Sequence, residues 1–180
     1  MQKLTLLLFF VMMVAFVSAQ EGPALMFGLN TEVAFPVANR FREAYHTGYG
    51  GGIRFQYGSS FLRGGSLSVS YMSFSAKGSG ARINGQVGIL PVLVGVRHNL
   101  AGNWYVEPQG GYAWYFFSNT ANGVNTRRTE AAVSFAFSTG IVSKDFDLSI
   151  RYQDALVVAN NHYGNIGIRV GYLLSKRKSK

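Results

Sequence analysis

Apolar and polar residues alternate along most of this chain, and the alternation restricts the possible folds more than any other feature of the sequence. Between residues 145 and 153, the apolar side chains Phe146, Leu148, Ile150 and Tyr152 alternate with polar ones. Successive side chains of a β-strand point to opposite faces of its sheet, so such a segment has one apolar and one polar face. No segment with a helical apolar period competes with this pattern. The chain is therefore predicted to be all-β.

The alternating segments are separated by connections that differ in length. The longer connections are 36–47, 75–84, 117–128 and 154–163, the tight ones are 99–103 and 143–144, and 58–65 is intermediate. This leaves eight strands of about 9–13 residues, close to the roughly 9–11 tilted residues that cross a bilayer. Short turns at one rim and longer loops at the other are typical of outer-membrane barrels. The predicted fold is an eight-stranded antiparallel up-and-down transmembrane β-barrel.

One segment, 87–98, is apolar on both faces and contains Pro91. We expect Leu90, Val92, Val94 and Val96 to lie on its outer face. Pro91, and Pro108 in the next strand, lack the N–H group that a closed sheet needs, and local bulges are expected at both.

The polar faces of the strands are rich in Gly, Ser and Ala, which suits the narrow interior of an eight-stranded barrel. The bulky apolar residues then face lipid. A soluble exported lipid-binding barrel, with its apolar face inward, is the alternative. Aromatic residues gather toward both ends of the strands, as in the interfacial girdles of membrane barrels. The predicted girdle residues are Tyr49, Tyr57, Tyr71, Trp104, Trp114, Phe116, Phe146, Tyr152 and Tyr172.

The N-terminal residues 1–19 have the pattern of a cleaved secretory signal peptide. Lys3 precedes an apolar run from Leu4 to Val17, and Val17 and Ala19 fit the small-residue positions before a cut. The predicted domains are this signal, an outer-membrane β-barrel over 20–174, and a basic periplasmic tail over 175–180. Both ends of the barrel are expected in the periplasm.

Two consecutive motifs resemble a known family. The run from Ile89 through Pro91 to Arg97, followed by Trp104-Tyr105-Val106-Glu107-Pro108-Gln109-Gly110-Gly111-Tyr112, is similar to strands of the porin-family outer-membrane β-barrel proteins of Gram-negative bacteria. The resemblance covers essentially the whole mature chain and implies a small barrel like the OmpX-like and OmpA-like proteins. It also implies recognition by the barrel-insertion machinery. The chain departs from the family at its end, where a basic tail follows Leu173 and Leu174.

Charged residues occur on the inward faces, although they make up only 14% of the chain. Charges in a confined lumen must be paired or hydrated. We predict an ion-pair network that plugs the lumen, and a small-solute or ion channel is the alternative. The inward charges are Glu32, Arg54, Arg97, Glu107, Glu130, Asp145, Asp147, Arg151 and Arg169. The predicted network consists of Glu32, Arg54, Arg97, Glu107, Arg151 and Arg169.

An enzyme is a third possibility, since some small outer-membrane barrels modify lipids. A hydrolytic site needs a Ser or a water activated by His, with a carboxylate to orient it. Among His46, His98 and His162, only His162 with the nearby Asp154 and a loop serine forms a combination worth testing, and no serine stands at motif spacing. There is no cysteine, no metal-ligand spacing and no phosphate loop before a helix. No catalytic residue, metal or cofactor is therefore predicted.

Without Lys3 of the signal the formal net charge of +9 becomes +8, which is expected mainly at the two rims and does not form a basic face for nucleic acid. We expect outer-membrane lipid and lipopolysaccharide as partners, because arginine pairs well with phosphate. No extracellular ligand is evident. The candidate lipopolysaccharide contacts on the long loops are Arg40, Arg42, Lys77, Arg82, Arg127 and Arg128.

Overall fold

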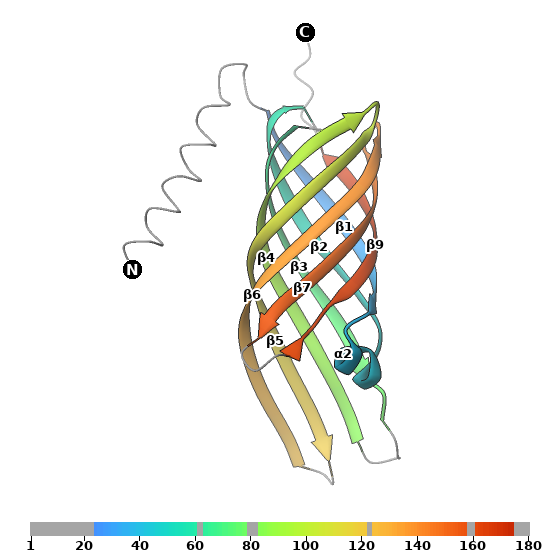
Figure 1. Ribbon diagram of the computed structural model, residues 1–180, viewed down its shortest axis with the longest axis vertical. Helices are drawn as coiled ribbons and strands as arrows, with labels where there is room; N and C mark the ends of the chain where they lie inside the picture. Colours follow the sequence, from blue (N-terminus) through green and yellow to red (C-terminus); the bar gives the residue numbers. More distant parts are fainter. Residues whose placement is uncertain (1–23, 61–62, 79–82, 122–123, 158–160, 175–180) are drawn as a thin grey trace, which may run out of the picture.

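Eight long antiparallel strands close into a barrel (Figure 1). The computed structural model describes residues 24–60, 63–78, 83–121, 124–157 and 161–174. From β1 to β8 each strand pairs with the next in the chain, and β9 lies between β1 and β7 to close the sheet. The predicted eight-stranded antiparallel barrel is confirmed. The strands are β1 (Ala24–Pro36), β2 (Tyr45–Ser60), β3 (Arg63–Ala76), β4 (Ile83–Ala101), β5 (Trp104–Ala121), β6 (Val124–Ser143), β7 (Phe146–Val157), the two-residue β8 (Asn161–His162) and β9 (Asn165–Leu174).

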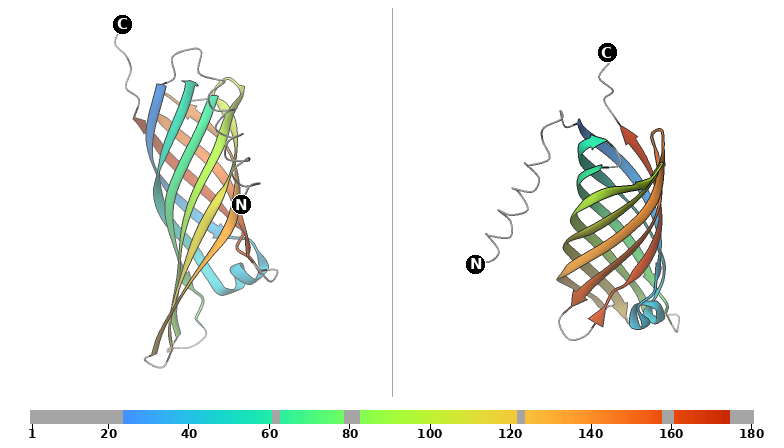
Figure 2. Two further views of the ribbon diagram at one scale, coloured as in Figure 1. Left: turned by 90° about the vertical axis from the view of Figure 1, so that its left-hand side faces the viewer. Right: turned by 45° about the horizontal axis from the view of Figure 1, so that its top comes forward.

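The two ends of the barrel differ. At one end, called the turn rim, β1 begins, β9 ends, and tight turns follow Ala101 and Ser143. At the other end, the loop rim, β1 is joined to β2 through the short helix α2 (Asn39–Ala44). Figure 2 shows that α2 lies against the loop rim on one side of the barrel. Residues 1–19 and 175–180, predicted as signal peptide and basic tail, lie outside the described residues.

The faces of the strands follow the predicted alternation. In β9 buried and exposed residues alternate without interruption from Asn165 to Leu174. In β4, Val94 and Val96 are exposed and Leu90 and Val92 are partly exposed, while Leu93 between them is buried. The expected outward face of this strand is therefore confirmed. Large apolar side chains cover the outer wall of the barrel.

The two strand prolines do not cause bulges, so that expectation was wrong. The register of β3 against β4 is the same before and after Pro91, from Val69↔Val92 to Met72↔Ile89. Pro91 still lies opposite Ala113 of β5 in regular register. The pairing with β3 lapses locally because proline has no N–H to donate, and the strand continues without a shift.

At the loop rim the strands are longer than predicted. The segment expected to be a loop over 117–128 is mostly strand, since β5 and β6 stay paired from Phe117↔Arg128 to Ala121↔Val124. The pairing of β4 with β5 reaches Ile83↔Ala121. In Figures 1 and 2 these three strands extend beyond α2 and form a sheet on one side of the mouth. The sequence did not predict it because its polar residues show no apolar alternation.

Helix α2 is held over the mouth by Phe41, which is buried. The Phe41 ring lies 5.1 Å from the ring of Phe74 and 5.6 Å from that of Tyr163, between centroids. These rings cover an apolar layer in the loop-rim half of the lumen, and burial of aromatic surface is a major source of stability. The buried apolar layer consists of Ala34, Phe41, Met72, Phe74, Val87, Ile89, Ala113, Tyr115, Ala132 and Ala155.

Candidate functional site

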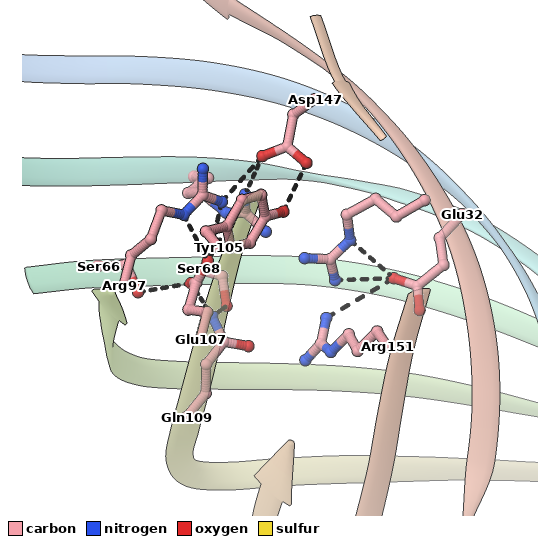
Figure 3. A network of polar contacts seen from close by, with 11 residues as sticks. Glu32, Ser66, Ser68, Arg97, Tyr105, Glu107, Gln109, Asp147 and Arg151 are labelled. Carbon is pink, nitrogen blue, oxygen red and sulfur yellow. Dashed lines mark hydrogen bonds and ion pairs between the residues drawn. The ribbon is translucent and has the colours of Figure 1, made fainter. Parts of the chain in front are cut away.

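Four charged side chains meet in the turn-rim half of the lumen. This turn-side cluster consists of Arg54 on β2, Arg97 on β4, Glu107 on β5 and Asp147 on β7 (Figure 3). Arg97 donates to Asp147 at 2.8 Å and to Glu107 at 2.9 Å, through Nη2 and Nε. Arg54 Nη1 donates to Asp147 at 2.9 Å and lies 3.9 Å from Glu107. Two arginines and two carboxylates therefore neutralise one another.

Neutral side chains complete the hydrogen bonding of the two carboxylates. Ser66 Oγ and Gln109 Nε2 each donate to Glu107 Oε1 at 2.7 Å. The Tyr105 hydroxyl donates to Asp147 Oδ1 at 2.6 Å, and the Arg97 guanidinium lies 3.7 Å above the Tyr105 ring centre. Buried charges are tolerated when they are paired and hydrogen-bonded in this way. Tyr105 stands between Trp104 and Val106, which were predicted to face outward, so the strand period of two places Tyr105 inward. The sequence analysis did not include it among the lumen residues.

A second group, the Glu32 cluster, joins Glu32 of β1, Arg151 of β7 and Arg169 of β9. Arg169 Nη2 donates to Glu32 Oε2 at 2.8 Å, and Arg151 Nη1 lies 3.6 Å from the same oxygen. Gly167, next to Arg169 in the inward row of β9, makes room for the carboxylate, because a Cβ there would come within 2.1 Å of Glu32 Oε1. In Figure 3 the cluster lies beside the turn-side cluster in the lumen.

The six residues of the predicted network thus lie in two groups. Asp147, absent from the predicted six, links Arg54 and Arg97. Asp145 is not in the lumen, and its predicted inward position was wrong. It is exposed in the turn that follows Ser143, one residue before β7 begins. Glu130 pairs with Arg128 near the loop rim.

The candidate lipopolysaccharide contacts are distributed around the loop rim. Arg40 and Arg42 are exposed on α2, and Arg127 and Arg128 are exposed on the extended part of β6. Lys77 Nζ donates to the Arg42 carbonyl at 2.6 Å, which ties the end of β3 to α2. The sixth candidate, Arg82, lies outside the described residues.

His162 and Asp154 come together at the loop rim, with 3.4 Å between Nδ1 and Oδ2. Asp154 also accepts hydrogen bonds from the Tyr152 hydroxyl and from the Ala155 N–H. A serine also contacts Asp154, since the Ser134 hydroxyl donates to the Asp154 backbone carbonyl at 2.8 Å. Burial and the proximity of Glu130 raise the pKa of Tyr163, which lies next to His162 in the chain.

The predicted girdle residues all lie on the outer wall. Trp104, Phe146 and Tyr172 lie near the turn rim, where Phe146 pairs with Tyr172 across β7 and β9 at 5.3 Å between ring centres. Each of the nine is exposed, from 36% for Trp114 to 65% for Tyr49. The full set is Tyr49, Tyr57, Tyr71, Trp104, Trp114, Phe116, Phe146, Tyr152 and Tyr172.

In the parts of the chain that the structure describes, no three His, Asp or Glu side chains are grouped as metal ligands. No helix in the same residues has the length and apolar character to cross a membrane.

A closed eight-stranded antiparallel barrel with an apolar outer wall and a charged, hydrogen-bonded lumen has the architecture of the outer-membrane β-barrels. No protein-family model matches the chain, and no curated protein sequence does.

Several solved structures share the fold. The N-terminal barrel domain of Pseudomonas aeruginosa OprF matches with a TM-score of 0.59 and 12% identity, over 83% of this chain and 97% of that one. The attachment invasion locus protein Ail of Yersinia pestis matches with a TM-score of 0.57 and 11% identity, over 84% and 97%. Neisserial surface protein A matches with a TM-score of 0.56 and 12% identity, over 86% and 99%. The chain has the fold of these small outer-membrane barrels.

Proposed function

We propose that this chain is an integral outer-membrane protein with a structural or surface-interaction role and a lumen closed to solutes. The observation that carries the proposal is the filling of the lumen in two layers. The turn-side cluster and the Glu32 cluster occupy one part, and the apolar layer under Phe41 occupies the loop-rim half. An eight-stranded barrel has an interior only wide enough for side chains.

Conductance in a planar bilayer tests the closed lumen. The purified protein is expected to give no steady channels of porin size at neutral pH. A variant with Arg97→Ala and Asp147→Ala, which removes two buried groups of the turn-side cluster, is the matched comparison. Regular channels from the wild-type protein would contradict the proposal, whatever the variant does.

The proposed orientation has the loop rim outside the cell and both ends of the barrel in the periplasm. It can be tested with single cysteines, because the chain contains none. Asn125 lies on the extended part of β6, and Lys144 lies in the turn between β6 and β7, and both are exposed. In intact cells, an impermeant maleimide is expected to label N125C and to leave K144C unlabelled until the outer membrane is opened. The reverse labelling would overturn the orientation.

The surface role proposed for the loop rim is contact with polyanions, with lipopolysaccharide phosphates first. Arg40, Arg42, Arg127 and Arg128 expose their side chains at this rim, and arginine binds phosphate with two parallel hydrogen bonds. The barrel of Yersinia pestis Ail has been solved in complex with the heparin analogue sucrose octasulfate, and it matches this chain with a TM-score of 0.58. A sulfated glycan is therefore a reasonable second probe.

The amount of lipopolysaccharide that copurifies with the protein distinguishes a binding site at the loop rim from arginines that are merely solvated. The double variant R127Q/R128Q is expected to keep less lipopolysaccharide on purification than the wild type. A variant with Arg63→Gln and Lys144→Gln removes the same charge at the turn rim and is expected to keep as much as the wild type. Equal losses in the two variants would indicate a net-charge effect and would count against a site on the loop rim.

We propose no enzymatic activity. The hydroxyl of Ser134, the serine that touches Asp154, is buried and donates to a carbonyl oxygen rather than to His162. The name of Ail refers to attachment and invasion, that of Neisserial surface protein A refers to the surface, and the OprF domain is described only as a β-barrel; none of the three names refers to a reaction. Lipid A acyl transfer or deacylation by the wild-type protein, lost in H162A, would overturn this part of the proposal.

A further inference from the structure

The two charged clusters of the lumen differ in their charge balance. The turn-side cluster has two arginines and two carboxylates. In the Glu32 cluster, Arg151 and Arg169 share one carboxylate, and both approach the same oxygen, Oε2, at 3.6 and 2.8 Å. The Glu32 cluster therefore holds one positive charge in excess. A buried charge without a counter-charge is strongly unfavourable, so this excess needs compensation.

The excess is centred on Arg151. Its side chain is completely buried, and its Nε, Nη1 and Nη2 atoms have no hydrogen-bond partner among the described residues. Arg169 Nη1 also has no hydrogen-bond partner among the described residues, although Nε and Nη2 of Arg169 donate to Glu32. Guanidinium N–H groups can only donate, so the groups they require are acceptors.

Two hydroxyl donors lie beside Arg151. Ser138 of β6 is its direct partner across the strands, and Ser149 is its neighbour on the inward face of β7. The Oγ atoms of both serines are buried and have no hydrogen-bond partner in the described part of the chain. Within the same region the acceptors without partners include Gln153 Oε1 and Glu32 Oε1. The Arg151 guanidinium and the hydroxyls of Ser138 and Ser149 are thus hydrogen-bond donors that lie side by side on the inner wall.

Glu107, two strands away from Arg151, does not supply the missing negative charge. Glu107 lies on the far side of Ser138, opposite it on β5. Both of its oxygens are used, Oε1 by Ser66 and Gln109 and Oε2 by Arg97. The Glu107 charge is balanced within the turn-side cluster.

We propose that the lumen binds a small inorganic anion, of the size of chloride, against Arg151, with Arg169, Ser138 and Ser149 as further donors. The size follows from the barrel, whose eight strands leave space for side chains and little more. The anion neutralises the excess charge of the Glu32 cluster and acts as a structural component of the closed lumen.

Chloride-dependent stability tests the site. The full chain, refolded in detergent micelles, is unfolded in urea at constant ionic strength while chloride is exchanged for gluconate. If one ion binds only the folded state, the folded-to-unfolded ratio rises about tenfold for each tenfold rise in chloride above the dissociation constant. The exposed variant R128Q controls for anion binding at the loop rim and is expected to keep the full dependence.

Variants within the cluster should change this dependence in opposite directions. R151Q removes the excess charge and is expected to abolish the dependence. E32Q removes the shared carboxylate, so the dependence is expected to begin at a lower chloride concentration. S138A keeps every charge and should shift its onset to a higher concentration, which preserves the test if R151Q does not fold.

Crystals grown in bromide locate the ion directly, because bromide scatters anomalously. A peak at hydrogen-bond distance from the Arg151 guanidinium is the expected result. A wild-type protein without chloride dependence, an equal dependence in R151Q, or ordered water without bromide at Arg151 would each overturn the site. None of these outcomes depends on the conductance result, so the site can fail while the closed lumen stands.

Discussion

Arg97 and Asp147 lie 50 positions apart in the chain and on strands that are not neighbours, yet they meet in the lumen at 2.8 Å. The bond spans from β4 to β7, so it joins opposite parts of the wall through the interior. Asp147 also accepts from Arg54 and Tyr105. It therefore accepts hydrogen bonds from both arginines of the turn-side cluster.

Replacing Asp147 by Asn should destabilise the barrel strongly. Arg54 and Arg97 would then share Glu107 alone, and one buried positive charge would be uncompensated. Loss of one partner of a buried ion pair costs about 3–5 kcal/mol. Urea unfolding followed by the difference in gel mobility between folded and unfolded barrel measures the change.

Asp145→Asn is the matched control for that experiment. Asp145 is two residues earlier in the chain, has the same side chain and is exposed in the turn. Its substitution is expected to change stability within about 0.5 kcal/mol, as is usual for surface positions. Similar losses in the two variants would contradict a special role for the lumen carboxylate.

Gly167→Ala tests the fit of Glu32 against the wall. The new Cβ would lie 2.1 Å from Glu32 Oε1, so the carboxylate must move away from its position beside Arg169 and Arg151. We expect a loss of about 1–3 kcal/mol, typical of overpacking in a well-filled interior. Gly110→Ala is the control, because no atom lies within 4 Å of the Cβ it adds. A tolerated G167A with an unchanged urea midpoint would show that Glu32 has space to move.

Removing the Phe41 side chain should loosen the mouth without unfolding the barrel. Phe41→Ala deletes the ring that α2 packs against Phe74, Tyr45 and Tyr163. Hydrogen exchange of the amides in α2 is expected to become faster by at least tenfold, while amides of β9 keep their protection. Glu43→Ala, at an exposed position of the same helix, should leave both unchanged. Equal protection of α2 in F41A and wild type would contradict this role of the ring.

A charge placed on the outer wall distinguishes a lipid-facing surface from a water-facing one. Ile150 is exposed between the girdle residues Phe146 and Tyr152 of β7, on the lipid-facing side of the strand expected for this barrel. Ile150→Arg is expected to cost about 2–4 kcal/mol in lipid vesicles, the range for arginine near the bilayer midplane. Phe146→Arg, at the girdle, should cost less because the arginine reaches the interface. A soluble barrel would tolerate I150R better than F146R or equally well.

The sequence predicts which residues face the lumen because strand geometry alone determines it. Arg54, Arg97 and Glu107 were assigned inward from the period of two, and their buried positions agree with that assignment. The partners inside the lumen could not be predicted in the same way. Whether Arg97 meets Asp147 depends on strand tilt and on the stagger between strands that closes the barrel, and neither is encoded in any one segment.

The errors at the ends of strands have a similar physical cause. In the sequence, Asp145 continues the polar positions of β7, but it lies in the turn before Phe146 and is exposed. Beyond Phe117, which still packs on the apolar layer, the paired ends of β5 and β6 project past the barrel, and residues 125–128 are exposed, so these ends show no apolar period. Helix α2 has only six residues and is held by the burial of Phe41, so its sequence alone does not specify a helix.

The sheet of β4, β5 and β6 beyond the mouth has a consequence for how this protein meets its neighbours. Among the residues that the structure describes, the pairing of β6 with β7 begins at Val133, and between Val133 and Val124 β6 pairs with β5 alone. Those nine steps span roughly 30 Å along the strand. A plain cylinder can rotate about its axis without changing what surrounds it. A barrel with a sheet projecting from one side lacks that symmetry, so rotation about its axis changes the direction in which the projecting sheet points.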